Sequence, residues 1–337
     1  MLEIRKSARG FVAIGVLVAG ALAGVTLAQQ VPSTPPTPHE TPRSMIDALH
    51  AAFGEHHARA VHAKGLLLEG TFTASPDAAR LSRAAIFTAA RTVPVTARFS
   101  DFTGIPDIPD TASEANPRGF AVKIRSTGGD VDIVTHSFNG FPVATSDEFA
   151  VFLLAIGDSG PGRPHPTPIE EFLDHHPIAK RFVTSQKPPP VSYATAAYFG
   201  VNAFKLINAS GQAVFVRYRF VPRAGEHAVT PMELKGKDPN YLLDELPRRI
   251  AREAIVFDWF AQIAHNGDKA DDPSVAWPED RTLVQLGTVT MTCMSNAPDA
   301  DRTTLFLPGT LHPGIEPADA MLVMRNDAYP LSFKARQ

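Results

Sequence analysis

The hydrophobic pattern of the chain repeats with two periods, one typical of β-strands and one typical of helices. Short segments at 93–100, 118–126 and 131–137 alternate apolar and polar residues or are rich in β-branched residues, with turn-forming residues between them. Segment 204–220 favours a hairpin, and segment 281–294 favours a further strand or strand pair. The pattern therefore predicts a mainly antiparallel sheet.

Segments with a helical period interrupt these strands. We expect a helix that opens at Ser44, with Asp47 completing an approximate capping box, and a helix capped by Ser146 before an acidic first turn. Pro168 favours the first position of another helix. The predicted helices cover 44–53, 78–90, 146–156, 167–182 and 246–265. Strands and helices together predict an α+β fold in which helices pack around an antiparallel sheet or barrel.

The N-terminal part differs in composition from the rest of the chain. A basic segment precedes an uncharged apolar run at 11–28 that ends in small residues, which is the pattern of a bacterial secretory signal peptide. The same run approaches the length of a membrane span, so an uncleaved anchor is the alternative. We assign 1–29 to a signal peptide or anchor, 30–43 to a proline-rich linker and 44–337 to one globular domain. Either reading places the domain outside the cytoplasm, in the periplasm.

Composition narrows the classes of partner. A net charge of -3 gives no basic excess for nucleic acid or an anionic membrane surface, so we expect no nucleic-acid partner and membrane contact only through the N-terminal segment. A small ligand fits this balance better. The single cysteine, Cys293, excludes an internal disulfide and a site made of several thiolates.

Candidate chemistry begins at His62, which lies in the apolar segment 59–72, a predicted strand pair. Arg59 precedes it by three residues, and segment 93–100 adds Arg98 and Ser100 on one strand face. Two arginines near an apolar interior need anionic partners, which two carboxylates on an otherwise apolar planar ligand would supply. The alternative for His62 is a core histidine with both nitrogens satisfied.

Several motifs resemble the haem catalase family. These are "RAVHAKG", "VPVTARFS", "NPRGFAVKI", "DVDIV", "FKLINASGQAVF", "AWPEDRTLVQLGTVTM" and "HPGIEPADAMLVMRNDAY". They occur in the family's order across residues 45–337, and the short exported form resembles catalase-related peroxidases. The resemblance implies an antiparallel β-barrel core that binds haem b, with surrounding helices and without the C-terminal domain of large catalases. It also implies a monomer or small homo-oligomer.

The resemblance carries roles to individual residues of the distal side. His62 is similar to the distal histidine that takes a proton from peroxide and returns it to the leaving oxygen, and we expect it to titrate near its ordinary pKa of ~6.5. Ser100 resembles the hydroxyl that fixes the tautomer of this imidazole. Arg59 and Arg98 match the positions that pair with the haem propionates.

The proximal side is implied by "RNDAYP". Arg325 and Tyr329 are one helical turn apart, and the guanidinium would favour Tyr329 as a tyrosinate ligand to iron. Read alone, this pair would be an exposed helical pair. Phe141 and Phe149 fall where the family has aromatic residues beside the haem pocket and the substrate channel, with ordinary core residues as the alternative.

One position departs from the family. Where catalases carry an asparagine that binds peroxide, an ungapped alignment places His136, with Ser137 and Asn139 as neighbouring candidates. Loss of that amide should weaken the reaction with a second peroxide more than peroxidase turnover.

The expected function is therefore a haem peroxidase that reduces hydrogen peroxide or organic hydroperoxides through a ferryl intermediate, with weak or no catalase activity and an unknown small-molecule reductant. The alternatives are a hydroperoxide isomerase or dehydratase, and a haem-binding protein without enzymatic activity.

Overall fold

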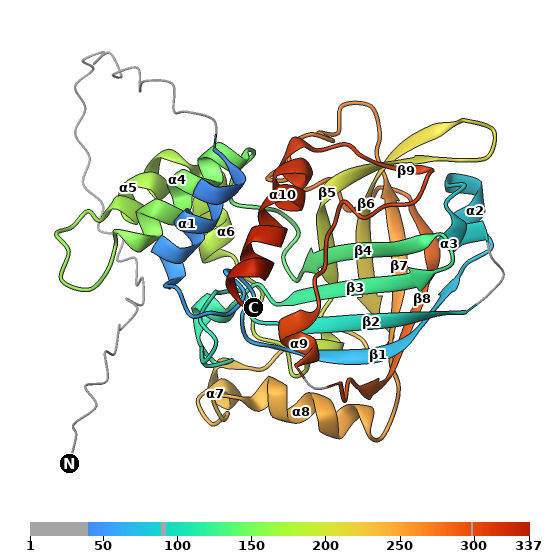
Figure 1. The fold of residues 1–337 in the computed structure, drawn as a ribbon. Helices are drawn as coiled ribbons and strands as arrows, with labels where there is room; N and C mark the ends of the chain where they lie inside the picture. The colour runs from blue at the N-terminus through green and yellow to red at the C-terminus, as the bar shows by residue number, and fades with distance from the viewer. Residues whose placement is uncertain (1–39, 89–91, 298) are drawn as a thin grey trace.

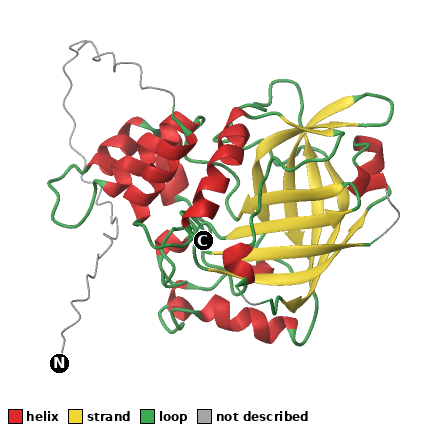
Figure 2. Cartoon of the chain, in the orientation of Figure 1, coloured by secondary structure: helices red, strands yellow, loops and turns green. Residues whose placement is uncertain are grey.

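The computed structural model of the chain describes residues 40–88, 92–297 and 299–337. The predicted leader 1–29, with its possible anchor at 11–28, lies outside the described residues. Figures 1 and 2 show a β-barrel with most helices on its left, others below it and two short ones on its right. The strands are β1 (Gly65–Ala74), β2 (Val93–Ser100), β3 (Gly119–Ser126), β4 (Gly129–His136), β5 (Tyr198–Ile207), β6 (Ala213–Pro222), β7 (Ile255–Ile263), β8 (Leu283–Met294) and β9 (Ile315–Pro317).

The strands form one antiparallel sheet in the order β4-β3-β2-β1-β8-β7-β6-β5-β9. A pairing between β4 and β5, at His136 opposite Phe199, closes β1 to β8 into a barrel, and the short β9 pairs with β5. The predicted antiparallel sheet, the hairpin β5–β6 and strand β8 are confirmed. Gly211 adopts a φ of 82° at the hairpin turn, a conformation that glycine tolerates without strain.

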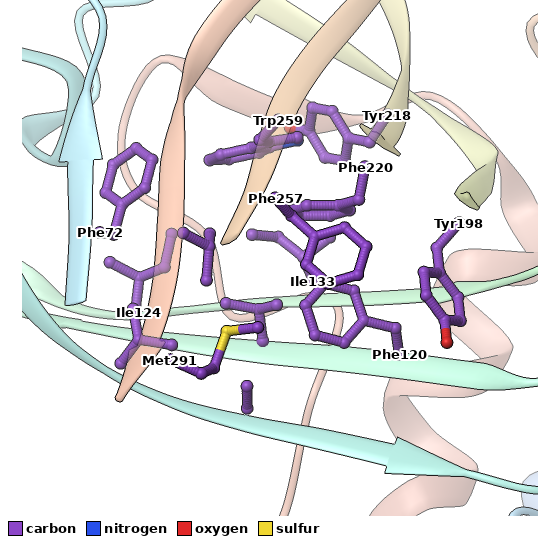
Figure 3. Close-up of a cluster of buried hydrophobic side chains, with 14 of the residues drawn as sticks. Phe72, Phe120, Ile124, Ile133, Tyr198, Tyr218, Phe220, Phe257, Trp259 and Met291 are labelled. Atoms are coloured by element: carbon purple, nitrogen blue, oxygen red, sulfur yellow. The ribbon is translucent and has the colours of Figure 1, made fainter. Parts of the chain in front are cut away.

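Aromatic and aliphatic side chains fill the barrel. Phe120, Phe220, Phe257 and Trp259 are at most 1% exposed, and their rings pack together as Figure 3 shows. Burying a side chain of this size stabilises the fold by roughly 1.5–3 kcal/mol. Because the interior is a packed core, a ligand must bind outside the barrel.

The helices lie outside this core. They are α1 (Pro42–Phe53), α2 (Ala78–Leu81), α3 (Ala85–Thr88), α4 (Ser146–Gly157), α5 (Pro168–His175), α6 (Pro177–Thr184), α7 (Pro231–Leu234), α8 (Tyr241–Ile250), α9 (Ala300–Thr303) and α10 (Ala320–Ala335), with single turns η1 (Ser113–Ala115) and η2 (Tyr193–Thr195). In Figure 1, α10 runs between the barrel and a bundle formed by α1, α4, α5 and α6. Within the described ranges, every helix is too short or too polar to span a bilayer.

One predicted helix start differs by two residues, and in a second helix the capping residue differs by one. Helix α1 begins at Pro42, because Thr41 is the N-cap and Ser44 completes the capping box from the third position. In α4 the side chain of Thr145, not Ser146, accepts the capping hydrogen bond. In both cases a threonine that precedes the predicted capping or starting residue is the N-cap.

Two predicted elements are wrong. The helix expected over 246–265 ends at Ile250, and 255–263 is strand β7, whose burial alternates between successive residues. Residues 59–64 are a loop and not a strand, and His62 has a φ of 58° there. The loop is held by backbone hydrogen bonds from His62 to Phe102 and from Ala63 to Thr103, contacts that no local pattern reveals.

Two predicted helices are each divided. Pro177 ends α5 and starts α6, since proline lacks the N–H that would continue the helix and its ring clashes with the preceding turn. Segment 78–90 contains the single turns α2 and α3, separated where the Ser82 side chain accepts from Ala84 N and donates to Gly314 O. Residues 89–90 lie outside the described part.

Candidate active site

A cavity with about 1350 Å³ of empty space, part of it open to solvent, lies against β2, β3 and β4 and is bordered by α1 and α10. Most of its surface is apolar. Every site residue predicted from the sequence lines it: Arg59, His62, Arg98, Ser100, His136, Phe141, Phe149, Arg325 and Tyr329. The fold thus brings together side chains from segments that are far apart in the sequence.

His62 is held in one orientation from its Nδ1 side. Nδ1 lies 3.0 Å from the carbonyl oxygen of Asp101 and 3.1 Å from Ser100 Oγ. Because a carbonyl oxygen only accepts, Nδ1 carries the proton and Nε2 keeps a free lone pair. A Cβ at Gly119 would lie 2.7 Å from His62 Nδ1, so the absent side chain makes room for the ring.

Burial, followed by the charges of His136 and Arg98, lowers the pKa of His62 to about 3. This differs from the ordinary value expected from the sequence. The cause is the depth of the site and its positive surroundings, neither of which a local segment shows. His62 is therefore neutral throughout the physiological pH range.

His136 is a second imidazole in the same cavity. It ends β4, at the pairing with β5 that closes the barrel. The backbone N–H of Phe138 donates to Nδ1 at 3.4 Å, so Nε2 carries the proton, and this buried atom has no partner among the described residues. Burial, followed by the charge of Arg325, lowers the pKa of His136 to about 3.

The neighbouring candidates point elsewhere. Ser137 Oγ accepts from the backbone N–H of Arg118 at 2.9 Å, and Asn139 donates to Glu279 at 3.0 Å. Neither residue lines the cavity. Of the three candidates for the position where catalases carry an asparagine, only His136 lines the cavity.

Helix α10 presents Arg325 and Tyr329 to the cavity. Arg325 Nε and Nη2 donate to the Tyr329 oxygen at 3.0 and 2.8 Å. Both donors belong to a cation and converge on this single oxygen, so the guanidinium fixes the position of the phenol ring in the cavity. Arg325 Nη1 donates to Asn202 Oδ1, and Asn202 Nδ2 donates to Asp319 at 2.7 Å.

Sequence reasoning missed Asn202 and Asp319. Asp319 is the N-cap of α10 and accepts from the backbone N–H of Met321 at 2.8 Å, so it fixes the helix start and the arginine network together. Asp319 could have been found from the sequence, because an aspartate directly before an apolar helical segment favours an N-cap. Asn202 lies inside β5 and carried no local signal.

The predicted propionate arginines already have a protein anion. Arg98 Nε donates to Asp301 at 2.5 Å and Nη2 donates to it at 3.1 Å, while Nη1 donates to the carbonyl of His62 at 2.8 Å. Arg59 Nη2 donates to the carbonyls of Asp301 and Thr304 at 2.6 and 3.0 Å. Asp301 in α9 therefore supplies one carboxylate to these arginines, a partner that the sequence did not indicate.

A third arginine at this end, Arg336, was not predicted. It ends α10, is 6% exposed, and donates to the carbonyls of Arg302 and Thr304 at 2.9 Å. Burial, then the charge of Arg98, lowers the pKa of Arg59 to about 8, and the same two causes lower that of Arg336 to about 10. One carboxylate thus faces three crowded guanidinium groups.

Phe141 and Phe149 form an aromatic pair with ring centroids 4.9 Å apart. Phe149 also stacks on Phe152, which belongs to the core between α4 and α5. Both predicted roles are thus compatible, since these rings line the cavity and also join the helix bundle.

The residues present fit a haem. The large apolar cavity suits a flat macrocycle, and the buried Arg59 Nε is a donor without a partner among the described residues, which a carboxylate of such a ligand would satisfy. In the described part of the chain, no group of three or more His, Cys, Asp or Glu side chains could hold a bare metal ion. A single phenolate is sufficient as a protein ligand when a porphyrin already holds the iron.

Comparison with known proteins agrees with this fit. The sequence model of the family described as Catalase matches residues 49–336. The chain is similar to a catalase-related peroxidase of Synechococcus elongatus (35% identity, 88% of each chain) and to one of Mycolicibacterium paratuberculosis (38% identity, 88% of this chain and 95% of the relative).

Larger catalases share the fold. The structure of catalase A from Saccharomyces cerevisiae has a TM-score of 0.73 and 21% identity over 83% of this chain and 61% of that one. The catalase of Vibrio parahaemolyticus is 29% identical and is matched over 55% of its length. Because the family model covers most of the chain and two relatives exceed a third in identity, the chain belongs to the catalase family, whose cofactor is haem.

Proposed function

We propose that this protein is a haem b peroxidase that reduces hydrogen peroxide or organic hydroperoxides through a ferryl intermediate, with a small-molecule reductant and weak or no catalase activity. Membership of a family of peroxide-consuming oxidoreductases and the two catalase-related peroxidases among its relatives support the class of reaction. One observation carries the proposal. The same cavity holds an oxygen clamped by Arg325 and an imidazole with a free Nε2.

Haem, when bound with Tyr329 as its ligand, supplies the iron at which the O–O bond is cleaved. Arg59, Arg98 and Arg336 would hold its carboxylates. The three guanidinium groups exceed the single carboxylate of Asp301, so an anionic cofactor relieves their mutual repulsion.

His62 moves the proton. Its Nε2 lone pair accepts a proton from the bound peroxide, while Nδ1 remains fixed by Asp101 and Ser100. A pKa of about 3 keeps the ring neutral until it takes this proton, and the imidazolium then gives the proton to the departing oxygen. The base form is present at any pH well above 3.

His136 supplies a donor. Its Nε2–H has no other partner among the described residues and can donate to a peroxide oxygen. An asparagine amide at this position would offer two N–H donors and one acceptor, whereas His136 offers a single N–H. One donor orients a second peroxide poorly, which supports weak catalase activity.

The test compares two products of the purified, haem-loaded protein. With hydrogen peroxide and an aromatic one-electron donor, we expect donor oxidation to account for most peroxide consumed, with little oxygen evolved. The variant His136→Asn should evolve more oxygen per peroxide, because the amide restores the missing donor. Oxygen evolution by the unaltered protein as fast as donor oxidation would contradict the proposal.

We also propose that the protein is exported to the periplasm, either by a cleaved leader at 1–29 or with residues 11–28 retained as a membrane anchor. We propose that it is a monomer or a small homo-oligomer. The basic and apolar pattern of the N-terminal segment supports export. Cell fractionation of the full chain tests it, and a cytoplasmic protein of unprocessed mass would contradict it.

A further inference from the structure

Behind His62 lies a buried polar cluster that the proposed chemistry does not use. Asp101, Arg118 and Tyr193 are each 0% exposed. Arg118 pairs with Asp101 Oδ1, and the Tyr193 hydroxyl donates to the same oxygen at 2.8 Å. Asp101 Oδ2 is buried and has no partner among the described residues. The buried phenol of Tyr193 thus faces a carboxylate that can still accept a hydrogen bond or a proton.

This cluster adjoins the cavity through one residue. The carbonyl oxygen of Asp101 accepts from His62 Nδ1–H at 3.0 Å, and its carboxylate accepts from Tyr193. The backbone and side chain of a single aspartate therefore connect the peroxide site to a tyrosine.

Stacked rings make a second connection. Tyr193 stacks on Phe99 with centroids 5.5 Å apart and planes at 14°, and Phe99 stacks on Phe120 at 4.7 Å and 15°. Phe120 lines the cavity and is one of the labelled core rings in Figure 3. Successive aromatic contacts of this kind provide a short route for electron transfer between the cavity and Tyr193.

A buried tyrosine can lose an electron readily only if its hydroxyl proton has somewhere to go. Asp101 is placed to take it, and burial raises the pKa of its carboxyl to about 6, with Arg118 acting in the opposite direction. Tyr198 offers a contrast within the same core. Its ring is 5.1 Å from Phe120, but its hydroxyl donates to the Tyr193 carbonyl, which is not a base.

We propose that Tyr193 is a redox-active residue that gives one electron to the peroxide-oxidised haem and its hydroxyl proton to the Asp101 carboxylate. The Tyr193 O–H bond breaks, a carboxyl O–H bond forms on Asp101, and the haem is reduced by one electron. A one-electron reductant later restores the phenol, and Asp101 returns the proton. Tyr193 holds one oxidising equivalent away from the cavity, which suits donors that deliver electrons singly. The inference rests on the proposed function, which supplies the oxidant.

The test uses the haem-loaded full chain, mixed with one equivalent of hydrogen peroxide without a donor and frozen within seconds. Electron paramagnetic resonance reports the radical, and the visible spectrum reports the haem separately. We expect a tyrosyl radical in the unaltered protein, its loss in Tyr193→Phe and its retention in Tyr198→Phe. Ring-deuterated tyrosine should narrow the signal, which identifies its source.

The variant Asp101→Asn separates proton acceptance from hydrogen bonding. It keeps an acceptor for Tyr193 but removes the base, so the radical should lose most of its intensity. Since the variant removes the carboxylate that pairs with buried Arg118, it can fail to fold, and the pair Tyr193→Phe and Tyr198→Phe then carries the test alone. A haem that responds to peroxide with no radical, or with a radical unchanged in Tyr193→Phe, overturns the inference and leaves the proposed function standing. A haem that does not respond overturns both.

Discussion

Two imidazoles are kept neutral in a pocket that already contains several positive charges. Burial is the largest cause of the lowered pKa of both His62 and His136, and neighbouring arginines add to it. Neutrality gives the two rings opposite roles, because His62 presents a lone pair and His136 an N–H. The arrangement has a consequence for stability, since unfolding would let both rings take up protons.

We predict that lowering the pH from 7 to 5 destabilises the fold. The folded-state pKa values of about 3 lie below the ordinary 6.5, so the stability they contribute is complete above 6.5 and is lost as pH falls toward 3. Each histidine accounts for at most about 2 kcal/mol over this interval. Asp101, Asp132 and Asp319 oppose this loss, because burial raises the pKa of each carboxyl. Asp258 and Asp268 act in the same direction as the histidines, because hydrogen bonds from Arg223 and Arg281 lower their pKa values.

Urea unfolding of the unaltered protein and of His136→Phe at both pH values checks this prediction. The variant should lose less stability on acidification than the unaltered protein. An equal loss in both proteins would show that His136 is not held neutral.

A second prediction concerns Arg325. The variant Arg325→Leu removes both donors to the Tyr329 oxygen and leaves Asn202 without its cation. Hydrogen bonds to charged groups contribute about 1.5–3 kcal/mol, so haem should dissociate roughly tenfold faster or more. Transfer of haem to apomyoglobin measures the rate, and Arg325→Lys serves as the control that keeps the charge. Unchanged dissociation in Arg325→Leu would contradict the role of the clamp.

Among the elements, helix α9 is only one turn long, but it supplies the carboxylate that pairs with the arginines of the cavity. Its Asp301 bonds Arg98 through two oxygens and adjoins Arg59. We predict that Asp301→Ala destabilises the haem-free protein by about 1–2 kcal/mol, a value reduced by the 43% exposure of the carboxylate. The loss should be smaller with haem bound, because its carboxylates face the same guanidinium groups.

Thermal unfolding with and without haem measures this difference. Asp299→Asn is the control, since it removes an exposed charge at the start of the same helix, with only a 3.9 Å contact to Arg302, and asparagine tolerates the φ of 53° there. Equal destabilisation by Asp301→Ala in both forms would show that no haem carboxylate lies near Arg98.

The strands show which elements could be predicted from the sequence and which could not. Strands β2, β3 and β4 were predictable because each alternates over a short segment bounded by turn residues. Strand β7 was not, because its apolar residues satisfy a helical period as well and follow directly on the end of α8. Burial in the barrel, which the local pattern does not contain, decides between the two periods.

The candidate site divides in a similar way. Residues within family motifs, such as His62 and Tyr329, could be carried over one at a time. Asp301, Asn202 and Arg336 act through partners distant in the sequence or through burial, as in the contact from Arg98 to Asp301. The motifs also gave no indication that His62 has a positive φ, because its loop is fixed by hydrogen bonds to residues after β2.

At the scale of the whole molecule, the packed core inside the barrel stabilises the fold, and the candidate site lies outside it. The core inside the barrel has no space for a ligand, so the cavity forms where β2 to β4 meet α10 and α1. Haem bound there would join the barrel to the helices and stabilise the entire fold by mass action. The cavity is lined by several arginines and is positively charged, although the whole chain has a net charge of -3. This positive charge favours an anionic cofactor.

We propose that Tyr329 binds haem iron in a pocket where His62 activates peroxide. The most direct measurement is the visible spectrum of the purified, haem-loaded protein and of Tyr329→Phe, before and after one equivalent of hydrogen peroxide. We predict a high-spin ferric spectrum with a tyrosinate ligand that is lost in Tyr329→Phe, and a spectral change on adding peroxide to the unaltered protein. A spectrum that is the same in the variant, or a protein that takes up no haem, would contradict the account.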